Sequence, residues 1–117
     1  KKCALNILHI CDFHGRYRDL SPFTRYPGDI VNCGLELENG AVTSREVSRM
    51  FDRPFMGGLD RHGTIVTGTE SEIRKEARAA VSKAPDRFLL GADCTLPSDI
   101  SWDNIRTAIR TAHKEME

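Results

Sequence analysis

The chain has 117 residues, enough for one domain, and its 29% charged and 39% hydrophobic residues are typical of a globular protein. Its 17 basic and 17 acidic residues balance, so charge gives no reason to expect nucleic acid or an anionic membrane as partner. No apolar run approaches the roughly 18 residues of a membrane span, and we expect no signal peptide. We expect a single domain over residues 1–117, cytoplasmic, with its four cysteines reduced.

The first part of the chain predicts two strands and one short helix. Residues 4–10 form an apolar strand, and the polar and aromatic residues 12–18 form the loop after it. Residues 20–26 suit a short helix with Pro22 in its first turn. Residues 29–33 form a second short apolar strand.

Two capping boxes predict the helices in the middle of the chain. Thr43 is followed three residues later by Glu46, and Thr69 is followed in the same way by Glu72. In each pair the two side chains can bond to backbone N–H groups at the start of a helix. Between these helices, residues 55–59 form a third strand.

The last part of the chain predicts a fourth strand over residues 87–92 and a final helix over residues 101–114. The apolar spacing of this helix predicts an inward face made of Trp102, Ile105, Ile109 and Ala112. Strands that alternate with helices imply a parallel sheet with right-handed crossovers. In such a sheet the ligand site lies at the carboxyl ends of the strands.

Soft metal ligands stand at two of these strand ends. His9 and Cys11 are two residues apart, so on a strand they point to the same side, and Cys94 ends a distant apolar run. This pattern suits zinc, which takes nitrogen and sulfur ligands and, with three from the protein, keeps a position open for substrate. A thiol bound there stays deprotonated. Asp12 or Asp93 would hold the His9 ring from behind.

The alternative for this cluster is that its cysteines are small buried hydrophobes and its histidine a satisfied core residue. Cys3 and Cys33 are interpreted as structural, because neither has a histidine nearby in the sequence. Substrate contact is the hypothesis for two further segments, at the positions Asp60, Arg61, His62 and Arg16. The alternatives there are a tight turn that needs glycine and a solvated loop.

These segments together resemble the uroporphyrinogen decarboxylase superfamily over nearly the whole chain. The matching pieces are LHIC at 8–11, GGLD at 57–60, the helix opened by TGTESEI at 67–73, and FLLGADC followed by LP and WDNIRTAI. The resemblance implies a TIM (β/α)8 barrel. This chain would be a fragment of a longer protein, its C-terminal half: an α/β, parallel half barrel of four strands and about four helices.

The resemblance also implies the chemistry. His9, Cys11 and Cys94 match the zinc site of the branch that transfers a methyl group between a corrinoid protein and a thiol. The alternative is uroporphyrinogen decarboxylation in tetrapyrrole biosynthesis, by an atypical member, because Asp93-Cys94 stands where those lyases have a His-Gly pair. The non-enzymatic alternative is a binding module with structural cysteines.

A half barrel on its own has two open sheet edges and an inner face that lacks its usual filling of side chains. We therefore expect a homo-oligomer of half barrels. The intact protein is expected to be an enzyme and the isolated fragment to be inactive. Because the first and fourth strands are not neighbours, we also expect His9, Cys11 and Cys94 to meet only when a second half closes the barrel.

Overall fold

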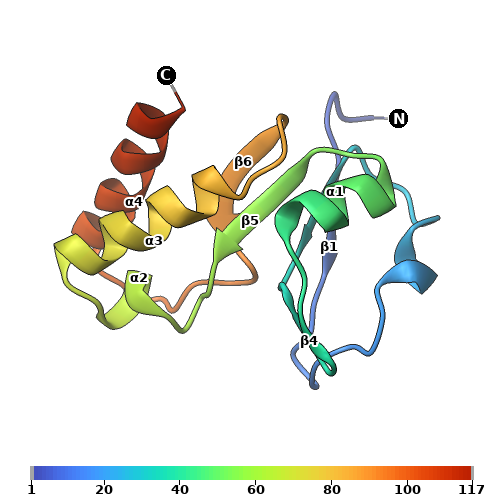
Figure 1. Ribbon diagram of the computed structural model, residues 1–117, viewed down its shortest axis with the longest axis horizontal. Coiled ribbons are helices and arrows are strands. Elements are labelled where there is room, and N and C mark those ends of the chain that lie inside the picture. Colours follow the sequence, from blue (N-terminus) through green and yellow to red (C-terminus); the bar gives the residue numbers. More distant parts are fainter. Residues whose placement is uncertain (1, 117) are drawn as a thin grey trace.

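A four-stranded parallel sheet in the order β1-β2-β5-β6 forms the centre of the molecule (Figure 1). The structure, a computed structural model, describes residues 2–116. The strands are β1 (Ile7–Ile10), β2 (Ile30–Cys33), β5 (Phe55–Leu59) and β6 (Phe88–Ala92). The predicted α/β fold with four parallel strands is thus confirmed. The observed strands end where the sequence predicts, and three of them begin one to three residues later than predicted.

The α-helices are α1 (Ser44–Phe51), α2 (Thr64–Thr67), α3 (Glu70–Ser82) and α4 (Trp102–Glu115). Helices α1 and α3 pack on the sheet, whereas α4 lies against α2 and α3 at the far side of the molecule from β1 (Figure 1). No helix in the described part of the chain is long and apolar enough to cross a membrane.

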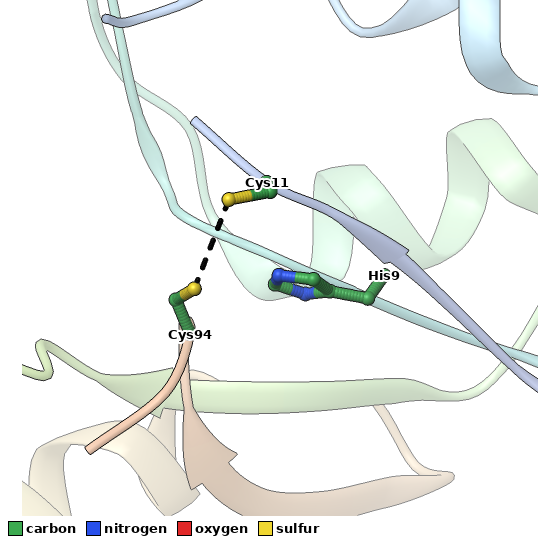
Figure 2. A group of neighbouring side chains, drawn as sticks. All are labelled: His9, Cys11 and Cys94. Atoms are coloured by element: carbon green, nitrogen blue, oxygen red, sulfur yellow. Dashed lines mark hydrogen bonds between the residues drawn. The ribbon is translucent and has the colours of Figure 1, made fainter. Parts of the chain in front are cut away.

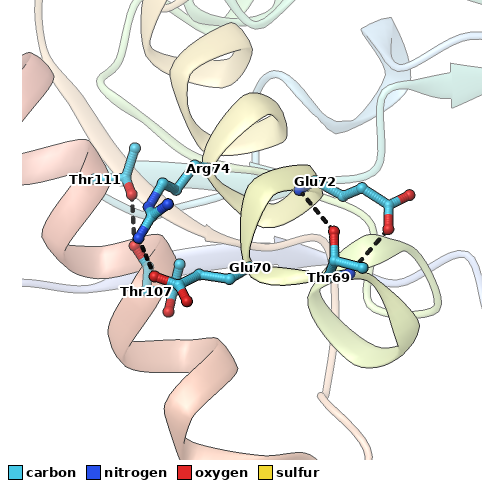
Figure 3. Close-up of polar contacts among 6 residues, drawn as sticks. All are labelled: Thr69, Glu70, Glu72, Arg74, Thr107 and Thr111. Atoms are coloured by element: carbon cyan, nitrogen blue, oxygen red, sulfur yellow. Dashed lines mark hydrogen bonds and ion pairs between the residues drawn. The ribbon is translucent and has the colours of Figure 1, made fainter.

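Both predicted capping boxes are present. At the start of α3, Glu72 N–H donates to Thr69 Oγ1 at 3.2 Å and Thr69 N–H donates to Glu72 Oε1 at 2.9 Å (Figure 3). Thr43 and Glu46 form the same pair at the start of α1.

Two further polar contacts lie on α3 and α4. One turn into α3, Arg74 pairs with Glu70 on the exposed surface (Figure 3). In α4, the Thr111 hydroxyl bonds back to the Thr107 carbonyl at 2.7 Å (Figure 3).

The connection between β1 and β2 differs from the prediction of a helix over residues 20–26. It contains only a 3-10 turn, Ser21–Phe23, without a side-chain cap. Asp19 accepts the Ser21 N–H at 3.0 Å, a local bond that favours a turn over a helix. Between β2 and α1 the chain forms a small antiparallel hairpin, β3 (Glu36–Leu37) and β4 (Gly40–Ala41).

The inward face of α4 also differs from the prediction. Ala108, Thr111 and Ala112 are buried, whereas Trp102 is 71% exposed and Ile109 is 45% exposed. The helix carries more than one apolar stripe, and small side chains let α4 approach its neighbour α3 closely. The stripe of small residues is therefore the one that packs, and only Ala112 of the buried residues was part of the predicted face.

The sheet has one covered and one open face. On the covered face, Ile10, Val31 and Phe55 form a core with Val47 and Phe51 of α1. Strand register and alternation place the following residues on the opposite face: Ile7, His9, Asn32, Met56 and Leu89. On this face the edge-strand residues Ile7 (47%) and Leu89 (42%) are exposed among the described residues, whereas Ile30 and Asn32 of β2 are buried. We call this side, which the core of α1 does not cover, the open face. A parallel four-stranded sheet with helices packed on one face is compatible with half of a barrel.

Candidate metal centre

Three metal-ligating side chains meet at the carboxyl end of the open face. His9 lies on β1, Cys11 follows β1, and Cys94 follows β6; their side chains point toward one another (Figure 2). One ligand atom from each of the three lies within 4.8 Å of the others. The residues that the sequence motifs predict as ligands are thus brought together within one chain.

The expectation that these ligands meet only in a closed barrel is wrong. Strands β1 and β6 are the two edges of the sheet, yet Cys11 and Cys94 approach each other across it. Successive strands in a sheet are rotated by roughly 20–25°, so four strands already form a curved surface. Both cysteines also follow the last residue of their strands, so the regular distance between hydrogen-bonded strands no longer fixes how far apart they lie.

The spacing of the two sulfurs fits zinc. Cys11 Sγ and Cys94 Sγ are 3.8 Å apart. Two sulfurs that each lie about 2.3 Å from a tetrahedral zinc ion are roughly 3.8 Å apart. A donor set of two cysteines and one histidine also matches catalytic zinc, where the fourth position takes water or substrate. The donor chemistry and the sulfur spacing therefore both fit this metal.

Cys94 is biased toward the thiolate form that metals bind. Its pKa lies below the usual thiol value, first because the Thr95 backbone N–H donates to its sulfur. Partial burial opposes this shift, and the contact with Cys11 lowers the pKa further. Since the thiolate is the metal ligand, these surroundings favour binding at Cys94.

Cys33 has the opposite surroundings, although it lies only one strand away. It is 1% exposed and packs in the core on the helix-covered face. Burial raises its pKa to about 12, and the negative charges of Asp12 and Asp93 add to this effect. The structural interpretation of Cys33 therefore agrees with its position, whereas Cys3 is exposed.

The His9 ring is held by Asn32, a residue to which the sequence motifs do not point. His9 Nδ1 lies 2.6 Å from Asn32 Oδ1 on the neighbouring strand β2. This differs from the expectation of Asp12 or Asp93 in this role. The only signal in the sequence is a polar residue inside the short apolar strand IVNC, which requires a buried partner.

Asp12 and Asp93 instead line a cavity of about 220 Å³ that also receives Asp60 and Glu76. Asp93 Oδ1 accepts the backbone N–H of Arg61 at 2.9 Å. The pKa of Glu76 is raised, mainly by burial and further by the charge of Asp60. This cavity is therefore acidic. Cys33 lines it, whereas Cys11 and Cys94 are only the chain neighbours of Asp12 and Asp93.

The remaining substrate candidates lie in two places. Arg16 lines a cavity of about 560 Å³ together with Cys11, and the Tyr17 hydroxyl donates to the Cys11 carbonyl at 2.6 Å. His62 lies in the turn after β5, where its backbone N–H bonds to Asp60 Oδ1 at 2.8 Å. Asp60 and Arg16 thus border two different cavities. The His62 N–H bonds within the turn, and the Arg61 N–H links the turn to Asp93 after β6.

The fold is similar to a solved structure of a methyltransferase from Methanosarcina mazei. The TM-score is 0.67 at 17% sequence identity, over 92% of this chain and 30% of that chain. At this identity the likeness shows the fold alone, and this chain spans less than a third of that protein's length. No family model and no curated protein matches the sequence.

Proposed function

We propose that this chain is the zinc-bearing part of an enzyme that transfers a methyl group to a thiol. The observation that carries the proposal is the convergence of His9, Cys11 and Cys94, with a sulfur spacing that suits tetrahedral zinc. The methyltransferase fold of the M. mazei protein and the resemblance to the uroporphyrinogen decarboxylase superfamily support it.

Zinc in such a site lowers the pKa of a bound thiol, so that a thiolate nucleophile exists at neutral pH. His9, Cys11 and Cys94 would hold the metal, and three protein ligands would leave a fourth position for the substrate thiol. In the transfer, a bond forms between the substrate sulfur and the methyl carbon. The bond between that carbon and its donor breaks, and the electron pair stays with the donor. The proposed donor is a corrinoid carried by a partner protein.

The cavity that Cys11 lines is the proposed site for the substrate thiol, and the acidic cavity is a second proposed site for another part of the substrate. The cavity at Cys11 is lined by Arg16 as well as Glu38, and the Arg16 guanidinium suits a thiol with an anionic group. The acidic cavity at Asp12 and Asp93 suits a cationic group instead. Asp60 is the proposed contact in the acidic cavity.

The test is zinc-dependent methylation of a thiol by the intact protein, with methylcobalamin as donor and mass spectrometry of the thioether as readout. We expect product with zinc, none after chelation, and none from Cys94→Ser. The control is Cys3→Ser, which removes an exposed cysteine outside the site and should retain activity. Equal methylation with and without zinc, or carbon dioxide release from uroporphyrinogen in place of methylation, would contradict the proposal.

A further inference from the structure

We infer that Asn32 is a positioning residue that keeps the proton of the His9 ring on Nδ1 and thereby directs the Nε2 lone pair to the metal. The inference rests on the proposed zinc function, which assigns His9 as a ligand. It concerns a residue outside the His-x-Cys motif, on strand β2. The hydrogen bonds of this one side chain carry the argument.

The orientation of the Asn32 amide is fixed by two backbone carbonyls. Its Nδ2 donates to Met56 O at 2.8 Å and to Ala92 O at 3.0 Å. A carbonyl oxygen accepts hydrogen bonds and donates none, so the atom that faces both carbonyls has to be the amide nitrogen. The amide oxygen therefore faces His9, and a flipped amide would place two acceptors against each other at both carbonyls.

This orientation decides the tautomer of His9. An amide oxygen only accepts, so the ring nitrogen that lies 2.6 Å from it has to be the protonated one. In the neutral ring the proton is then on Nδ1, and Nε2 carries the free lone pair that a metal requires. Asn32 is 5% exposed, so water has little access to replace it.

Asn32 also links the two edges of the sheet that supply the ligands. It lies on β2, bonds to His9 on β1, and bonds to Ala92 at the end of β6, two residues before Cys94. One buried side chain therefore positions the histidine ligand and the strand that ends in a cysteine ligand. Hydrogen-bond partners behind metal ligands orient them, and their loss lowers metal affinity by about 10–100-fold.

The first measurement is the protonation of the two His9 ring nitrogens in metal-free protein, by ¹⁵N NMR at about pH 8, where an ordinary imidazole is neutral. We expect the proton on Nδ1 in the wild type. In Asn32→Ala we expect both tautomers. A wild-type ring protonated on Nε2 would overturn the inference, whether or not any variant folds.

The second measurement is zinc affinity by competition with a chelator. We expect Asn32→Ala to bind zinc about 10–100-fold more weakly than the wild type. The matched control is Asn104→Ala, which removes another amide that donates to a backbone carbonyl, Ile65 O at 2.9 Å, away from the site. If Asn32→Ala binds zinc as tightly as this control, Asn32 does not position His9. If the wild type binds no zinc, the proposed function fails, and the tautomer measurement still decides the role of Asn32.

Discussion

The thiols of Cys33 and Cys94 have opposite surroundings, which raise the pKa of Cys33 and lower that of Cys94. The sequence alone favours Cys94 as the ligand, because it follows an apolar strand as Cys11 does and so lies at the same edge of a parallel sheet. It cannot give the pKa of either thiol, because burial by α1 and the charges of Asp12 and Asp93 depend on the fold. The role of Asn32 is hidden for the same reason, since its partners are 23 to 60 residues away.

The first prediction concerns stability at high pH. The folded-state pKa of Cys33 is raised from 9.0 to about 12, so folding favours the neutral thiol. Its contribution is fully present below pH 9.0 and is lost as the pH rises from 9.0 toward about 12. In that range the free energy of unfolding should fall by about 1.4 kcal/mol per pH unit from this group.

The measurement is urea unfolding of the wild type and of Cys33→Ala from about pH 8 to about pH 10.5. The variant leaves a cavity and should be less stable throughout, but its stability should fall less steeply with pH. Other titrating groups affect both proteins alike, so the difference between the two curves isolates Cys33. Parallel curves would show that the thiol is not buried as described.

At the scale of elements, local signals are read well from the sequence and contacts between elements are not. The boxes at Thr43 and Thr69 each depend on residues three positions apart, and both are present. Which face of α4 is buried depends on how α3 packs against it, and the spacing of apolar residues within α4 carries no information about α3. The apolar spacing therefore predicts that Trp102 faces inward, whereas the structure places it on the surface.

The second prediction concerns the close approach of α3 to strand β5 at Gly58. Gly58 has φ +105°, and a Cβ added there would lie 2.9 Å from Ala80 Cβ. Gly58→Ala should therefore combine backbone strain with a clash and destabilise the protein, by roughly 1–3 kcal/mol from the strain alone. The control is Gly15→Ala, where φ is +128° and an added Cβ meets nothing within 4 Å. Chemical denaturation should show a larger loss for Gly58→Ala; equal losses would contradict the close packing of α3.

At the scale of the whole molecule, the open face of the sheet predicts association. Ile7 and Leu89 are exposed there beside the candidate metal centre, and exposed apolar surface of this kind favours contact with another chain. The third prediction is that the protein forms a homo-oligomer through this face. Light scattering after size-exclusion chromatography should give a mass above that of one chain.

A matched pair of variants locates the contact. Leu89 on the open face and Met50 on α1 are both 42% exposed. Leu89→Lys should shift the protein toward the monomer, whereas Met50→Lys should leave the mass unchanged. A monomeric wild type, or the same shift in both variants, would contradict association through the open face.

Metal analysis decides whether His9, Cys11 and Cys94 hold zinc. The fourth prediction is that the purified wild type contains about one zinc ion per chain, measured by inductively coupled plasma mass spectrometry. Cys11→Ser and Cys94→Ser should each lose the metal, and Cys3→Ser should retain it. A wild type that takes up no zinc, or serine variants of Cys11 and Cys94 that keep it, would contradict the account.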